Sequence, residues 1–219
     1  MPLAFKDRAP TRLEKMCPFL SVKPLAPYFE ISTKQFLERF KKSLIPYGVN
    51  FYDEYKEKPD LYGPFWILTS LVLALFIAGN ISRYAEWEGD EKDFEYNYKV
   101  IPMAMGILYG TGALLPLLLK VALNLYGTNE HVTPLATTVG IYGYSFSTFL
   151  ITSVLCAIPV DWLQWILIGY SAIVAGVFIT KALWEDLKNS LEPKYRWVAI
   201  AFLGTIQMAL LLIFKLYFF

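Results

Sequence analysis

Five apolar segments, each long enough to cross a lipid bilayer, constrain this chain more than any other feature of its sequence. They are residues 64–80, 100–125, 135–158, 162–181 and 197–219. A hydrocarbon core about 30 Å thick needs roughly 20 apolar residues in a helix, and in lipid only helices and closed barrels satisfy every backbone N–H and C=O group. The sequence therefore predicts an all-α polytopic membrane protein with five transmembrane helices, and its 56% of hydrophobic residues agrees with this.

The polar first part of the chain, residues 1–63, is predicted to be a short cytosolic N-terminal region in front of the membrane domain, residues 64–219. Prolines and charges interrupt residues 1–30, so no cleavable signal sequence is expected. Sixteen of the 20 Lys and Arg residues fall on the side of the membrane that holds this region. The positive-inside rule then places the N-terminus in the cytosol and, after five spans, the C-terminus in the lumen.

One short amphipathic helix is predicted within the N-terminal region. Ser32 and Gln35 match a capping box, in which each residue bonds the backbone of the other at a helix start. Apolar residues then recur at helical spacing among basic ones, and Pro46 with Gly48 ends the pattern; these residues are Phe29, Phe36, Leu37, Phe40 and Leu44. Two alternatives stay open, because such a helix can lie on the membrane surface or cover its own protein.

The sequence Asp60-Leu61-Tyr62-Gly63-Pro64 stands at the boundary between the charged N-terminal region and the first apolar segment. Proline suits the first turn of a helix, because its missing N–H would have no partner there. A carboxylate just upstream can accept hydrogen bonds from the free N–H groups and meets the positive end of the helix dipole. We therefore expect Asp60 to cap the first transmembrane helix.

Small residues stand four positions apart in three of the predicted spans. The pairs are Gly106 with Gly110, Ala172 with Gly176, and Ala74 with Ala78. This spacing lets helix backbones approach closely in lipid, where apolar side chains gain little by leaving the hydrocarbon. The pairs predict helix packing, within one bundle in preference to a dimer interface.

Residues that could carry chemistry are scarce. Polar side chains inside the spans are mostly hydroxyls, and no Asp, Glu or Arg falls near a span centre, where proton relays and ion-coupled pumps need one. Lys120 is close enough to the interface to extend its amine there. One histidine, His131 in a short loop, and two cysteines, Cys17 and Cys156, make neither a metal site nor a disulfide framework. Protease, hydrolase and nucleotide-binding motifs are missing from the sequence. We therefore expect no enzyme, no metal and no cofactor, and the net charge of +1 disfavours nucleic acid.

Two motifs resemble those of a known family. Asp60 to Pro64 is similar to the DLYGP motif that opens the membrane domain of the YIPF family, the Ypt/Rab-interacting (Yip) membrane proteins. Tyr142-Gly143-Tyr144-Ser145, in the third predicted span, is similar to the family's YGYS motif. The likeness covers residues 28–219, and residues 28–44 resemble the late-Golgi branch of the family.

The resemblance implies a Golgi or ER-to-Golgi membrane protein of vesicle-mediated transport, which acts without catalysis and has membrane lipids as its surroundings and partners. It also implies a Rab GTPase partner and a Yif-type or other Yip-family five-span subunit. The two motifs are the residues expected to matter most, the first at the cytosolic surface and the second as an architectural or lipid-facing element. Two alternatives stay open: a lipid-handling or passive transport protein, whose hydroxyl-rich spans line a polar path, and an accessory subunit of a larger membrane complex.

Overall fold

A computed structural model of the chain describes residues 26–45, 55, 58–90, 93–127 and 133–219. Over these residues it is all-helical, and five helical segments are long and apolar enough to cross a membrane. The spans are α4 (Tyr62–Ala85), α5 (Val100–Tyr126), α6 (Leu135–Ser145) together with α7 (Ser147–Leu155), α8 (Asp161–Ser190), and α9 (Pro193–Ile213) continued by the π-helical turn η4 (Phe214–Phe218). The prediction of an all-α membrane protein with five spans is confirmed.

Helices α4, α8 and α9 extend beyond the apolar segments that predicted them. The first span was expected from Pro64 to Asn80, whereas α4 runs from Tyr62 to Ala85. The fourth was expected to end at Lys181, whereas α8 continues to Ser190. Hydropathy marks where a chain can lie in lipid, but a hydrogen-bonded helix continues into water while its residues favour the helical state.

The third span differs from the single helix expected over residues 135–158, because it breaks at Phe146 into α6 and α7. On either side of the break a serine hydroxyl donates to a carbonyl three residues back: Ser145 Oγ to Tyr142 O at 2.6 Å and Ser147 Oγ to Tyr144 O at 2.7 Å. Such bonds compete with the helical ladder and bend it, and they satisfy carbonyls that the break would leave unpaired.

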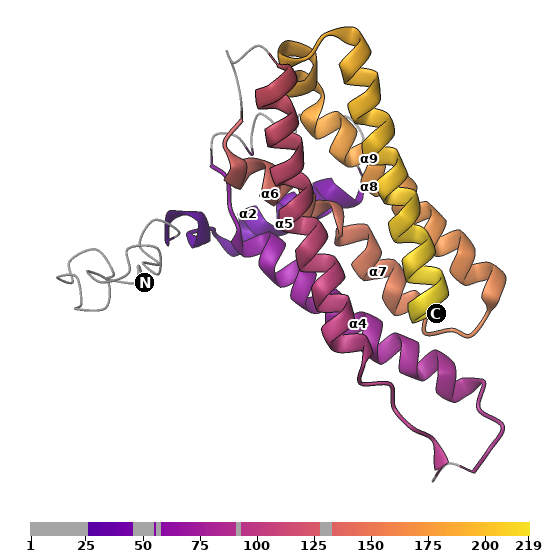
Figure 1. The fold of residues 1–219 in the computed structure, drawn as a ribbon. Helices are drawn as coiled ribbons and strands as arrows, with labels where there is room; N and C mark the ends of the chain where they lie inside the picture. The colour runs from indigo at the N-terminus through magenta and orange to yellow at the C-terminus, as the bar shows by residue number, and fades with distance from the viewer. Residues whose placement is uncertain (1–25, 46–54, 56–57, 91–92, 128–132) are drawn as a thin grey trace, which may run out of the picture.

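This broken third span is also the central one. In the most apolar 18-residue stretch of this span, 72% is buried inside the protein, compared with 22% in the corresponding stretch of the fifth span. Helices α4, α5 and α8 all contact α6. Figure 1 shows α6 and α7 between α5 and α9, while the lower end of α4 projects beyond the bundle.

Helix α2 (Thr33–Leu44) begins with the predicted capping box, in which the Gln35 N–H donates to Ser32 Oγ at 3.2 Å. The helix contacts α6, α7 and α8, so it covers its own protein, the second of the two alternatives. Phe36 and Phe40 pack against the core, but Leu37, expected in the same apolar stripe, is 48% exposed. The most buried face of α2 instead carries Arg39.

The end of the bundle away from α2 is tied together by the side-chain amide of Gln164 on α8. Its nitrogen donates to the Ser82 hydroxyl of α4 at 3.1 Å and to the Cys156 carbonyl after α7 at 3.0 Å. Its oxygen accepts from the buried Lys215 amine of η4 at 2.8 Å, and the amine also pairs with Asp161 at 2.7 Å. One side chain therefore links four of the five spans.

Replacing Gln164 by leucine is expected to destabilise this end. The change leaves Lys215 with one acceptor fewer and removes the donor to Ser82 and Cys156, so the expected cost is about 2 kcal/mol or more. Thermal unfolding of the purified protein in detergent micelles measures it. Thr205→Val is the control, because Thr205 is exposed on α9 and its hydroxyl donates to the Ala201 carbonyl of the same helix at 2.9 Å. Equal melting temperatures for Gln164→Leu and the native protein contradict this role.

Candidate functional site

Asp60 lies at the centre of a buried polar cluster at the start of α4. Only 2% of the Asp60 surface is exposed. One carboxylate oxygen accepts the Gly63 N–H at 2.9 Å and the Tyr144 hydroxyl at 3.2 Å. The other oxygen pairs with the guanidinium of Arg39. The N-cap position of α4 is Leu61, so Asp60 caps the helix from one residue upstream.

Arg39 brings α2 into this cluster. It is 3% exposed, donates to the Lys58 carbonyl at 2.7 Å, and stacks 4.7 Å from the centre of the Tyr55 ring. Tyr55 in turn donates its hydroxyl to the Asp60 carbonyl. Burial, and then the negative charge of Asp60, raise the pKa of the Tyr55 phenol, so it stays a protonated donor at any physiological pH.

Sequence reasoning missed both Arg39 and Tyr55. The one available signal was that α2 carries a single arginine among the lysines Lys34, Lys41 and Lys42. A guanidinium tolerates burial beside a carboxylate better than an ammonium does, because it is less strongly hydrated and can donate to two acceptors at once. A lone arginine on an amphipathic helix is therefore a candidate for a buried ion pair.

The two sequence motifs, DLYGP and YGYS, interlock at this cluster. Tyr144 and Asp60 are 84 residues apart in sequence, yet their side chains are hydrogen-bonded. A Cβ atom on Gly63 would lie 2.1 Å from the Tyr144 hydroxyl, and one on Gly143 would lie 2.3 Å from Cβ of Pro64. Glycine at both positions therefore permits the close approach of α4 and α6.

The structure places most of both motifs in the protein interior. Asp60, Gly63 and Pro64 are buried, as are all four residues from Tyr142 to Ser145, whereas Leu61 is half-buried and Tyr62 is 38% exposed. Neither motif as a whole can form a surface for a soluble protein. What they do is join α2, α4 and α6 into one unit.

The small-residue pairs lie in different surroundings. Gly106 and Gly110 face open space, with no atom within 4 Å of a Cβ at either position, so the expected packing inside the bundle is corrected for this pair. Spacing reveals that two residues share a helix face but not which way that face points. Ala172 is buried, and a Cβ on Gly176 would lie 3.7 Å from Gln207, so this pair lies at the contact of α8 with α9.

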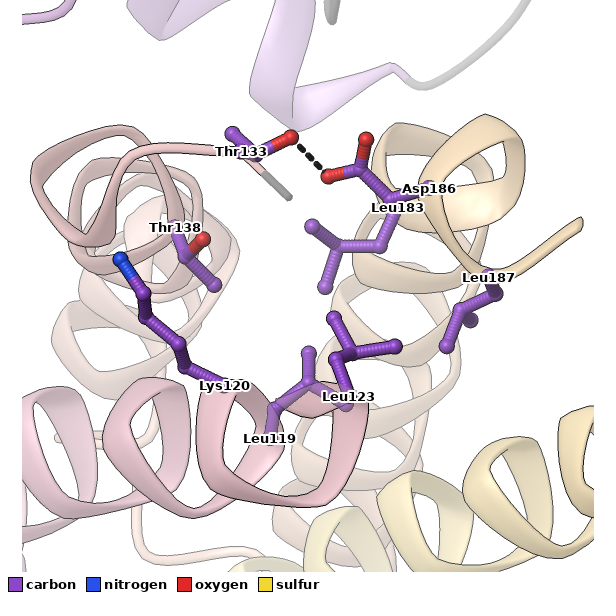
Figure 2. A pocket seen from close by; sticks show the side chains of 8 residues that line it. All are labelled: Leu119, Lys120, Leu123, Thr133, Thr138, Leu183, Asp186 and Leu187. Atoms are coloured by element: carbon purple, nitrogen blue, oxygen red, sulfur yellow. Dashed lines mark hydrogen bonds between the residues drawn. The ribbon is translucent and has the colours of Figure 1, made fainter. Parts of the chain in front are cut away.

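A small cavity of ≈ 10 Å³ lies between α5, the start of α6 and α8, with Lys120 in its wall (Figure 2). The Thr133 hydroxyl bonds to the Asp186 carboxylate beside it, and Lys120 and Thr138 both line it. Its volume suits about one water molecule. Among the residues that the structure describes, no group of three or more His, Cys, Asp or Glu could hold a metal. His131 and Cys17 lie outside the described residues.

Comparison with known proteins agrees with the motifs. The family model of the Yip1 domain matches residues 42–217. Over 220 residues the chain is 31% identical to Protein YIPF1 homolog of Dictyostelium discoideum, covering 98% of this chain and 62% of that protein. Over 163 residues it is 30% identical to Protein YIP5 of Schizosaccharomyces pombe, covering 71% of this chain and 64% of that protein. The chain thus spans less than two thirds of the length of these relatives, and no solved structure matches it.

Proposed function

This chain belongs to the Yip1 domain family, within its YIPF group, and on that premise we propose that it is a non-catalytic Golgi membrane protein of vesicle trafficking. In this role it presents a cytosolic surface to a Rab GTPase and a lateral surface to a Yif-type or other Yip-family subunit. Its five spans make it a multi-pass membrane protein. The excess of Lys and Arg on the α2 side supports a cytosolic N-terminus and a lumenal C-terminus.

The observation that carries this proposal is how α2 is held. The buried Arg39–Asp60 pair fixes one face of α2 on the bundle, so the opposite face is presented in a defined orientation. That opposite face, here called the outer face of α2, consists of Lys34, Leu37, Lys41 and Ile45, all exposed. Their spacing of three, four and four residues puts them in one stripe along the helix.

The outer face of α2 has the composition of a protein-docking helix. Leu37 is 48% exposed and Ile45 66%, so this face offers a partner two aliphatic side chains about two helical turns apart. Two lysines flank them, so the matching surface is apolar with an acidic rim. A Rab GTPase that offers such a surface is the partner we propose, and a rigidly mounted helix loses little entropy on binding it.

Capture of Rab GTPases by the full-length protein in nanodiscs tests this proposal. Leu37→Asp puts a charge in the centre of the outer face and is expected to weaken binding by about tenfold or more, the loss usual for an interface anchor. Leu125→Asp is the control, because Leu125 is a 72% exposed leucine at the end of α5, away from α2. The role fails if no Rab GTPase is retained in either nucleotide state, or if Leu37→Asp binds as well as the native protein.

The alternative of a polar path for lipids through the third span loses several of the hydroxyls that would line it. Three of these hydroxyls, on Ser145, Ser147 and Thr152, are bonded to backbone carbonyls of the same span. Thr152 is also bonded to the Ser171 hydroxyl of α8 at 2.6 Å. Side chains that satisfy their own backbone stabilise a broken helix, and they have less capacity to solvate a passing headgroup.

A further inference from the structure

Four aromatic side chains gather in the connection between α4 and α5, at the end of the bundle away from α2. Phe94 is at the centre of this group, which is here called the ring cluster. The other three rings stand edge-on to Phe94: Tyr84 at 5.1 Å between ring centroids and 83° between planes, Trp87 at 5.8 Å and 75°, and Tyr96 at 5.2 Å and 90°. Edge-to-face packing of this kind stabilises aromatic groups and gives them a fixed arrangement.

The segment that carries Phe94 and Tyr96 is attached to α4. The Asn97 N–H donates to the side-chain oxygen of Asn80 at 2.8 Å, and Asn80 is only 5% exposed. The Tyr98 ring stacks on Phe76 of α4, with 5.6 Å between ring centroids. A ligand that binds to the ring cluster therefore does not first have to order it.

The ring cluster is accessible and already lies against a cation. Tyr84 is 43% exposed, Trp87 45% and Tyr96 56%. The guanidinium of Arg83 lies 5.9 Å from the centre of the Phe94 ring. Single tyrosines and tryptophans are ordinary at a membrane interface. Several rings in contact around one centre are instead the arrangement that binds organic cations, because the face of each ring carries negative potential.

The charge around the ring cluster also favours a cation. Residues 83–99 contain six Asp and Glu against three Lys and Arg. Five of these carboxylates belong to the part of the chain that the structure describes, where all five are exposed and none forms an ion pair; they are Glu86, Glu88, Asp90, Asp93 and Glu95. They form no group of three that could hold a metal ion. The cation that suits this surface is therefore an organic one.

The position of the ring cluster in the chain decides which organic cation lies nearest. It connects two transmembrane helices, α4 ending at Ala85 and α5 beginning at Val100, so it lies at the level of the lipid headgroups. Choline and ethanolamine are the headgroups that carry a cation. The quaternary ammonium of choline has no N–H group to donate to water or to a carboxylate, and aromatic faces are its usual binding site in proteins.

We propose that the ring cluster binds the quaternary ammonium of a phosphatidylcholine headgroup, in the leaflet on the opposite side of the bundle from α2. The cation lies against the exposed rings, and the surrounding carboxylates balance its charge. This contact anchors the connection between the first two spans to bilayers that contain choline lipids. It is at the other end of the molecule from the outer face of α2, so it does not depend on the GTPase partner proposed above.

Fluorine NMR of the full-length protein labelled with fluorotryptophan tests the proposal, because Trp87 belongs to the ring cluster. Trp87→Phe assigns its signal. The probes are glycerophosphocholine and glycerophosphoethanolamine, which differ only in the methyl groups on nitrogen, added to the protein in maltoside micelles. The Trp87 signal is expected to shift saturably with the choline probe, at a midpoint lower by about threefold or more than with the ethanolamine probe. Trp197 is the control in the same spectrum, because it is 64% exposed but lies at the start of α9, and its signal should not move.

Nanodiscs show whether the lipid itself binds. In phosphatidylcholine nanodiscs the Trp87 signal is expected at its choline-saturated position, and in nanodiscs of phosphatidylethanolamine and phosphatidylglycerol at its free position. Tyr96→Leu removes one ring and is expected to raise the midpoint for the choline probe by about threefold or more. Tyr170→Leu is its matched control, because Tyr170 is 53% exposed but lies on α8. Thermal unfolding verifies that both variants are folded; if Tyr96→Leu is not, the two probes and the nanodiscs decide with the native protein.

Four results overturn the proposal. The Trp87 and Trp197 signals shift alike, or the ethanolamine probe binds as tightly as the choline probe. The Trp87 signal has the same position in both kinds of nanodisc, or the folded Tyr96→Leu variant binds the choline probe unchanged. Tighter binding of acetyl-arginine amide than of the choline probe also overturns it, and points to a basic protein segment as the occupant.

Discussion

Asp60→Ala is expected to lower the free energy of unfolding by about 3–5 kcal/mol, because it leaves the buried guanidinium of Arg39 without its counter-charge. The Tyr144 hydroxyl and the Gly63 N–H lose their acceptor in the same change. Loss of a helix cap alone would cost about 1 kcal/mol. A domain is typically stable by only about 5–15 kcal/mol, so the yield of monodisperse protein in mild detergent should fall sharply.

Two further variants give this expectation its controls. Glu38→Ala removes an exposed carboxylate from α2 itself and is expected to change the melting temperature little. Arg39→Met combined with Asp60→Ala removes both charges, and replacing a buried ion pair by apolar groups is often neutral or better. The double variant should therefore be more stable than Asp60→Ala alone. Two results contradict the ion pair as the main cause of the loss of stability. One is a melting temperature of Asp60→Ala equal to that of the native protein, and the other is a double variant that melts no higher than Asp60→Ala.

Much of the fold could be predicted because lipid leaves a chain few choices. Long apolar runs must be helices or barrel strands, so the five spans follow from composition and length alone. The capping box at Ser32 and Gln35 was equally readable, because its two hydrogen bonds join residues three apart. The break at Phe146 could not be predicted, because Ser145 and Ser147 are compatible with a continuous helix as well as with a bent one.

The candidate site was predictable only in its parts. Both motifs could be named from the sequence, but their contact joins residues 84 positions apart, and no local pattern encodes it. Burial of Arg39 goes against the usual placement of charges and follows only from the position of Asp60 opposite α2. Gly106 and Gly110 do share one face of α5, but that face does not point into the bundle as predicted. Small residues at i and i+4 indicate a shared face without indicating what the face contacts.

The close contact of α4 with α6 explains why the two motifs carry glycines, and a single methyl group tests it. Gly143→Ala would place its Cβ 2.3 Å from Cβ and 2.9 Å from Cα of Pro64. The proline ring is rigid and its Cα belongs to the backbone, so the helices must separate. Overpacking of this kind costs about 1–3 kcal/mol, and it also pulls Tyr144 away from Asp60.

Gly106→Ala is the control that separates packing from helix propensity. Alanine favours a helix over glycine by up to about 1 kcal/mol, and at Gly106 no atom lies near enough to oppose this gain. We therefore expect opposite signs: a lower melting temperature for Gly143→Ala and an equal or higher one for Gly106→Ala, measured by thermal unfolding in the same detergent. Because both changes add the same methyl group to a transmembrane helix, the difference between them isolates the contact with Pro64. Equal shifts in the two variants would mean that α4 and α6 can separate without loss, and that the contact of Gly143 with Pro64 does not stabilise the bundle.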